Sequence, residues 1–123
     1  MSFDSDLNRF IKRTGLETDI VIRKIVLDAH KMVTRKTPVK TGRAKGNWNV
    51  SVSFIDRSVN ESATSTPRGS PAIAPHLRKG DGLKVNYIVN SLPYIRRLEY
   101  GHSKKAPNGM VRVTVNELRS YFK

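Results

Sequence analysis

The chain has 123 residues, which fits one domain, because domains typically run to roughly 100–150 residues and a second core would lack material. Lys and Arg total 23 against 10 Asp and Glu, so the formal net charge of +13 predicts a polyanionic or acidic partner. With no cysteine and no apolar run near the roughly 18 residues of a membrane span, the composition excludes a disulfide framework, a thiolate zinc site and a membrane partner. We expect a soluble single domain over residues 1–123, made in a cytoplasm.

Two amphipathic helices are predicted at the start of the chain. Residues 3–14 carry apolar side chains at spacings of three or four. Thr18 and Asp19 offer an N-cap and an acidic first turn for a second helix over residues 19–36, which stops before Pro38. The apolar positions of this longer helix are Ile22, Ile25, Val26, Ala29, Met32 and Val33.

Two short strands are predicted in the middle of the chain. Residues 47–54 and residues 83–89 both alternate apolar and polar side chains, as half-buried strands do. The apolar face of the first strand consists of Trp48, Val50, Val52 and Phe54. Between the strands, residues 55–82 are rich in Pro, Gly, Ser and Thr with interspersed cations, which predicts an extended or flexible interaction loop.

The C-terminal part contains one short helix and an ambiguous ending. Residues 94–100 place apolar and basic side chains on opposite sides of a helix. After a turn at Asn108-Gly109, residues 110–115 favour a strand, whereas residues 116–122 could equally continue as a helix. These elements predict an α+β fold, with the long N-terminal helix packed on a small, mostly antiparallel sheet and a long basic loop.

No residue pattern is typical of an active site. His30, His76 and His102 lack partners at metal-ligand spacing. Glu99 lies near His102, but the groups of a catalytic triad converge from separate elements, so a hydrolase using this pair is only a rival hypothesis. Gly80-Asp81-Gly82 lacks the features of a phosphate-binding loop and is interpreted as a turn before a strand. The sequence predicts no enzyme, no cofactor and no metal site.

Basic residues in or beside loops are the candidate binding groups, because binding side chains are commonly displayed there. They are dispersed along the chain rather than gathered in a recognition helix, which favours non-specific attraction to phosphate over the reading of bases. The residues predicted to contact DNA or an acidic partner are Lys40, Arg43, Lys45, Arg78, Lys79, Lys104 and Lys105.

Two segments carry a resemblance to a known family. TPVKTGRAKGNW, residues 37–48, resembles the box that follows the first long helix in tail-completion and minor tail proteins of long-tailed bacteriophages. PYIRRLEYGHSKKAPNGMVRVTV, residues 93–115, looks like the second box of that family, which includes lambda Z-like neck and tail components. One departure is Asn108-Gly109-Met110, which stands where many relatives carry Arg-Pro-Phe. Both boxes occur in the family's order, after a long helix and with a variable loop between them.

The resemblance implies a structural virion protein at the tail top or head-tail neck, assembled in the host cytoplasm. The implied partners are further copies in a ring, six by the family's usual symmetry, together with the tail tube, the tail terminator, neck proteins and, non-specifically, genomic DNA. Glu99 is expected to pair with an arginine of its own subunit or of a neighbour across the ring. The residues expected at the subunit interface are Glu99, Tyr100, Arg96, Arg97 and Tyr94. The alternative is a monomeric or dimeric accessory protein that binds DNA non-specifically.

Overall fold

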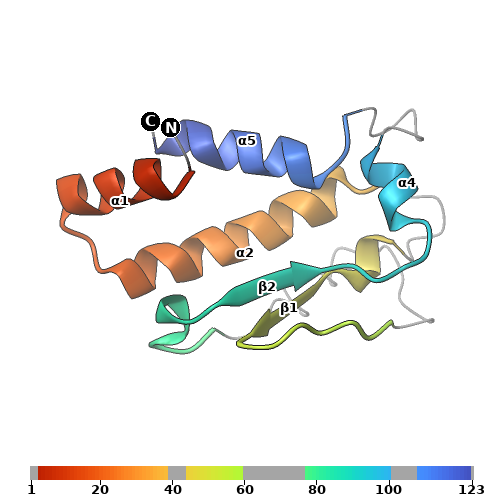
Figure 1. Ribbon diagram of the computed structural model, residues 1–123, viewed down its shortest axis with the longest axis horizontal. Coiled ribbons are helices and arrows are strands. Elements are labelled where there is room, and N and C mark those ends of the chain that lie inside the picture. The colour runs from red at the N-terminus through yellow and green to blue at the C-terminus, as the bar shows by residue number, and fades with distance from the viewer. Residues whose placement is uncertain (1–2, 39–43, 60–76, 101–107, 123) are drawn as a thin grey trace.

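The computed structural model describes residues 3–38, 44–59, 77–100 and 108–122. Three layers lie on top of one another, with the long helix α2 (Thr18–Lys36) in the middle (Figure 1). Helices α1 (Phe3–Thr14) and α5 (Val111–Tyr121) lie on one side of α2, and a two-stranded antiparallel sheet lies on the other. The predicted α+β fold is confirmed. Most of the predicted loop over residues 55–82 lies outside the described residues.

The two N-terminal helices match the prediction closely. Helix α2 begins one residue earlier than expected, and Glu17 rather than Thr18 is its N-cap, without a side-chain cap hydrogen bond. Leu7, Val21 and Phe122 form a buried cluster that joins α1, α2 and the end of α5. The ring of Phe10 meets the ring of Phe122 edge to face at a centroid distance of 4.8 Å. The two ends of the chain therefore lie side by side (Figure 1).

The sheet is shorter than the sequence pattern predicts. Strand β1 (Asn49–Val52) pairs with strand β2 (Asn86–Val89), and Val50 lies opposite Ile88. The first strand ends early because Ser53 has a φ of +71°, which breaks the extended backbone. Phe54 therefore does not lie on the buried face that the alternating pattern predicted, and it is 61% exposed.

Two 3₁₀ turns precede the strands, and only the first of them was not predicted. The turn η1 (Lys45–Asn47) leads into Trp48 and β1. The turn η2 (Asp81–Leu83) occupies the start of the predicted second strand, so that β2 begins only at Asn86. Gly80-Asp81-Gly82 is a turn before a strand, as expected.

The prediction of a strand over residues 110–115 is wrong, because this segment begins helix α5. The short helix α4 (Ile95–Glu99) matches its prediction and supplies a carboxylate that binds the first backbone N–H groups of α5. The buried residues at the start, along and at the end of α5 recur every fourth position: Met110, Thr114, Leu118 and Phe122. Burial of one helical face thus outweighs the weak strand preference of three valines.

The second core cluster lies where α2, the sheet and the C-terminal elements meet. Val33, Trp48 and Met110 are buried there, and Ile88, Ile95 and Leu98 pack against them. No helix within the described parts of the chain is long and apolar enough to cross a membrane.

Candidate functional site

The two segments that carry the family resemblance converge at one end of the molecule (Figure 1). Trp48, from the first segment, and Met110, from the second, are buried together against Val33 of α2. We call this region the motif end and define it as the described residues of four stretches. They are 34–38, 44–48, 93–100 and 108–112. Residues more than fifty positions apart therefore share one core cluster at this end of the molecule.

Trp48 fastens the first segment to α2 by a chain of hydrogen bonds. Its Nε1 donates to Thr37 Oγ1 at 2.8 Å, and that hydroxyl donates to the Val33 carbonyl at 2.6 Å. On the other side, His30 Nε2 donates to the Trp48 carbonyl at 3.0 Å. All three polar groups are buried, and buried polar groups are costly unless they are paired. Trp48 thus fixes the start of β1 to α2.

His30 is a buried structural residue. Burial lowers its pKa below the ordinary value of 6.5, and the hydrogen bond to the Trp48 carbonyl opposes this effect only in part. The ring is therefore neutral near pH 7 and fits a core position on α2. Among the described residues, no group of three or more His, Asp and Glu is placed to hold a metal ion.

Glu99 caps the helix that follows it. Its carboxylate accepts hydrogen bonds from the backbone N–H groups of Met110 at 2.9 Å, Val111 at 2.8 Å and Arg112 at 3.1 Å. The first turn of a helix has no internal partners for these groups, and its positive end favours an anion. Partial burial alone would raise the pKa of Glu99, but these hydrogen bonds outweigh it and hold the pKa below the ordinary 4.5.

The arginine partner expected for Glu99 lies in the same chain. Arg112 Nε donates to Glu99 Oε2 at 3.0 Å, and the same guanidinium also donates to the Glu99 backbone carbonyl. The Arg112 guanidinium lies 5.1 Å from the ring centre of Tyr100, within the range of a cation–π contact. Gly109 makes room for this arrangement, because a Cβ there would overlap the backbone carbonyl of Glu99. The placement of Glu99 at a subunit interface stays a prediction.

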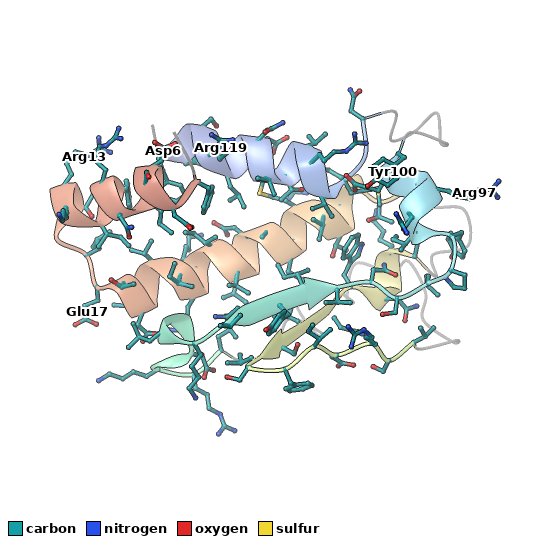
Figure 2. The ribbon with its side chains drawn as sticks, viewed as in Figure 1. Asp6, Arg13, Glu17, Arg97, Tyr100 and Arg119 are labelled. Atoms are coloured by element: carbon teal, nitrogen blue, oxygen red, sulfur yellow. The ribbon has the colours of Figure 1, made fainter. Side chains whose placement is uncertain are left out.

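The motif end displays exposed cations and an aromatic ring. Arg96 and Arg97 are exposed on α4, and Arg97 points away from the body of the molecule (Figure 2). Tyr100 is 60% exposed, whereas Tyr94 and Lys45 are half-buried. These are the predicted interface and binding residues that the structure brings together.

Arg78 and Lys79 lie at the opposite end of α2 from the motif end. They directly precede Gly80, whose backbone N–H binds Asp19 in the first turn of that helix. At a rise of 1.5 Å per residue, the two ends of α2 are about 25 Å apart. The predicted contacts for DNA or an acidic partner thus do not form one cluster. The remaining four, Lys40, Arg43, Lys104 and Lys105, lie outside the described residues.

The carboxylate of Asp19, like that of Glu99, binds backbone N–H groups, and the residue pattern did not predict this contact. It accepts the backbone N–H of Gly80 at 2.8 Å and of Gly82 at 2.7 Å, and it pairs with Arg23 at 3.1 Å. The hydrogen bond from Gly80 is the main reason that the pKa of Asp19 lies below the ordinary 3.8, with Gly82 and Arg23 adding to it and burial opposing it. The Gly-Asp-Gly turn lacks the features of a phosphate loop, yet its backbone N–H groups bind an anion, the carboxylate of Asp19.

Replacement of Gly82 by alanine tests this contact. A Cβ at Gly82 would overlap the Asp19 backbone carbonyl and lie 2.8 Å from its Oδ1. We expect Gly82→Ala to lower the free energy of unfolding, measured in urea, by about 2–3 kcal/mol. Gly80→Ala is the control: it meets no atom within 4 Å and strains only a φ of +97°. It should lose about 1 kcal/mol. An equal or smaller loss for Gly82→Ala would contradict the close approach.

Of the rival hydrolase pair, Glu99 and His102, only Glu99 lies among the described residues. Glu99 has its carboxylate bound by three backbone N–H groups and Arg112, and His102 and His76 lie outside the described residues.

Comparison with known proteins found no match for this chain among protein-family models, curated proteins or solved structures.

Proposed function

We propose that this chain is a structural protein of a bacteriophage virion, positioned at the tail top or the head-tail neck and assembled as a ring. The observation that carries the proposal is the convergence of the two family-like segments on one buried contact, Trp48 with Met110. The two segments occur in the order that the family has, and they come together at one end of the molecule. Segments that are distant in sequence must come together in this way if they are to form one docking surface. Tail tube, tail terminator and neck proteins are the proposed partners.

Charge supports the same proposal. A net charge of +13 makes identical copies repel each other unless acidic groups or a polyanion lie close by. Arg96 and Arg97 offer such a partner two exposed guanidinium groups on one short helix. Lys40, Arg43, Lys104 and Lys105 fall in the sequence segments that adjoin the motif end. In the proposed assembly these groups face DNA or acidic surfaces of neighbouring subunits.

Charge reversal at the motif end tests the proposal. In a phage that lacks this gene, complementation with Arg96→Glu plus Arg97→Glu should lower infectious titre by about 100-fold or more, because like charges across an interface cost several kcal/mol. Electron microscopy should then show heads and tails that remain unjoined. The matched control is Lys12→Glu plus Arg13→Glu, an equal charge change on exposed residues of α1. Arg13 lies at the opposite end of the molecule from Arg97 (Figure 2).

The same variants address the DNA-binding alternative. If the protein is only an accessory DNA-binding protein, Arg96→Glu plus Arg97→Glu should weaken its binding to DNA and reduce the salt dependence, yet leave heads and tails joined. Normal joined virions from this variant would count against the proposed neck or tail role. A protein that is absent from purified virions would count against it as well.

A further inference from the structure

Both edges of the two-stranded sheet carry unpaired backbone groups. The Ser53 backbone N–H donates to the Val85 carbonyl at 2.8 Å, and this pair fixes which residues of the antiparallel ladder bond to each other. The residues between those bonding pairs point their N–H and C=O groups outward, away from the partner strand. Within the described part of the chain, these outward groups have no hydrogen-bond partner. They belong to Val50 and Val52 on β1 and to Asn86 and Ile88 on β2.

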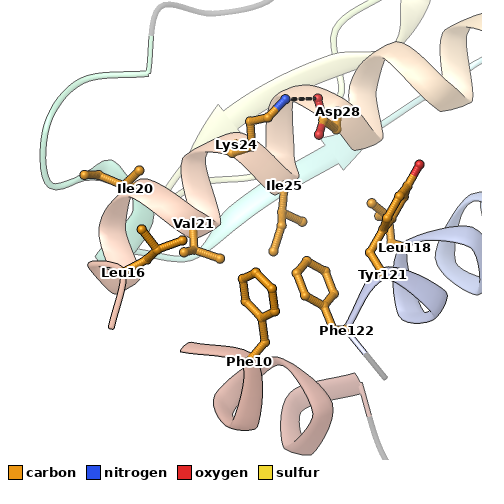
Figure 3. A pocket seen from close by; sticks show the side chains of 10 residues that line it. All are labelled: Phe10, Leu16, Ile20, Val21, Lys24, Ile25, Asp28, Leu118, Tyr121 and Phe122. Atoms are coloured by element: carbon orange, nitrogen blue, oxygen red, sulfur yellow. Dashed lines mark hydrogen bonds and ion pairs between the residues drawn. The ribbon is translucent and has the colours of Figure 1, made fainter. Parts of the chain in front are cut away.

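The neighbouring segments leave both edges open. Asn49 and Ser51 point from a face of β1 and bind the segment that follows the strand, through the carbonyls of Phe54, Asp56 and Ser58. This segment is therefore held on the face of the sheet and not on its edge. Helices α1 and α5 lie across α2 from the sheet (Figure 1), where the three helices line an apolar pocket of about 380 Å³ (Figure 3). Neither helix covers a sheet edge.

Neither strand has the residues that usually protect a sheet edge from another chain. Charged side chains and prolines commonly serve this purpose. The sequence of β1 is NVSV and that of β2 is NYIV, without a charged residue or a proline, although the chain has 23 Lys and Arg. Two copies can therefore bring these strands together without placing like charges directly opposite each other.

We propose that β2 of one copy pairs antiparallel with β1 of the next copy, so that the sheet continues from copy to copy. The inference rests on the proposed function, because it names the contact that joins copies in the ring. In the register of the internal pair, Asn86 lies opposite Val52 of the next copy, and Ile88 lies opposite Val50. Every outward backbone group of the two strands then has a hydrogen-bond partner.

The position of α2 favours this contact over the pairing of β2 with a second β2. Helix α2 packs on β2, where Ile88 contacts the core cluster that contains Val33. Two β2 strands side by side would bring their α2 helices to about 5 Å, because neighbouring strands are about 4.8 Å apart. Packed helices need about 8–10 Å between their axes. Pairing of β2 with β1 places a whole sheet between equivalent helices and separates them by about 10 Å.

This contact uses two different edges, so it is head-to-tail. Each added copy leaves one free β1 edge and one free β2 edge, and such an arrangement either closes into a ring or continues as a filament. Closure into a ring removes both free edges, as it does in a β-barrel. The predicted ring therefore has a specific structural origin in this chain.

Disulfide trapping tests the contact, because the natural chain contains no cysteine. In the proposed register, Val85 lies opposite Ser53 of the next copy, and both residues are exposed. Cα atoms at such a position approach to about 4.5 Å, which a disulfide can span. Purified full-length Val85→Cys and Ser53→Cys chains, mixed and mildly oxidised, should form at least about tenfold more covalent dimer than either chain alone. In either chain alone, the thiols of neighbouring copies are about 10 Å apart, which is too far.

A proline on the edge of β1 gives an independent test. Val52→Pro removes a backbone N–H that is free in a single copy, and proline is tolerated where the N–H of an edge strand faces solvent. Placed in the Ser53→Cys chain, it should lower the yield of mixed dimer by at least about tenfold and leave the circular dichroism unchanged. Ser51→Pro is the matched control, because it removes an N–H that bonds to Tyr87 within the copy and should disrupt the sheet itself.

Several outcomes would overturn the inference. A yield from Val85→Cys alone that equals that of the mixture would show a contact of like with like. An equal yield when Val115→Cys replaces Ser53→Cys would show random collision, since Val115 is 42% exposed on α5, away from the sheet. A folded Val52→Pro chain that still forms the mixed dimer would exclude pairing through this edge. If Val52→Pro does not fold, the comparison of the mixture with each chain alone decides.

The location of the protein separates this inference from the proposed function. If the mixture forms no excess dimer and the protein is still located at the neck or tail of virions, the contact is wrong and the proposed function stands. Excess mixed dimer from a chain that is absent from virions would support the contact and reject the proposed function.

Discussion

Trp48→Ala is expected to lower the free energy of unfolding by about 3–5 kcal/mol, the range for removing a buried large aromatic side chain. Trp48 is 4% exposed and contacts the cluster that includes Val33 and Met110. Its loss leaves a cavity and also leaves the buried Thr37 hydroxyl without its donor. Small domains are stable by only about 5–15 kcal/mol, so this variant should be partly unfolded at 37 °C. Urea unfolding followed by circular dichroism measures the change.

Two further variants make the Trp48 result specific. Trp48→Phe retains most of the apolar contact but cannot donate to Thr37, so it should lose about 1–3 kcal/mol. Tyr100→Ala removes an aromatic residue that is 60% exposed and should lose about 1 kcal/mol or less. Equal losses for Trp48→Ala and Tyr100→Ala would contradict the central position of Trp48 in the core.

Glu99→Ala is expected to lower the free energy of unfolding by about 2–4 kcal/mol. The variant removes the shared acceptor for the backbone N–H groups of Met110, Val111 and Arg112, and it removes the charge that favours the helix N-terminus. Glu99→Gln keeps an acceptor oxygen without the charge and should lose about half as much. Urea unfolding measures stability, and backbone amide exchange in the first turn of α5 reports the loss of the cap.

Glu117→Ala is the matched control for Glu99→Ala. It also removes a glutamate that pairs with a cation, Lys36 at 3.0 Å, but this side chain is 47% exposed and caps no helix. Exposed ion pairs contribute at most about 1 kcal/mol, so its effect should be small. Unchanged stability in Glu99→Ala together with failed virion assembly would reject the cap and favour the predicted interface role.

Helices α2 and α4 could be predicted from the sequence because the residue patterns that define each helix lie within that helix. Helix α2 repeats apolar side chains over its length and ends before a proline, which removes a backbone donor and disfavours helix in the residue before it. Helix α4 is short, but its apolar and basic residues segregate by the same period. In both helices, the hydrogen bonds join residues that are close in sequence, so the period of the side chains suffices.

The ending of β1 and the conformation of residues 110–115 could not be predicted in this way. Ser53 adopts a positive φ that its residue type does not demand, and this moves Phe54 from the expected inner face to solvent. Residues 110–115 resemble a strand locally, yet α5 starts at Val111 because Glu99 supplies the cap. The group that caps α5 lies on another helix, and the residue pattern alone does not show that the two helices are close in space.

Some features of the candidate site could likewise be predicted from the sequence, and others only from the tertiary structure. The sequence alone identified the two segments with family resemblance, the place of Trp48 on the apolar face of the first strand, an arginine as the partner of Glu99, and the cations Arg96 and Arg97. These follow from residue chemistry, because a large indole seeks burial and a carboxylate in a basic chain seeks a guanidinium. The tertiary structure alone decided that the two segments share one core and that the partner of Glu99 is Arg112 of the same chain. It also decided that Asp19 binds the Gly80 turn. Each of these depends on contacts between residues far apart in sequence, which arise only when the helices and the sheet pack together.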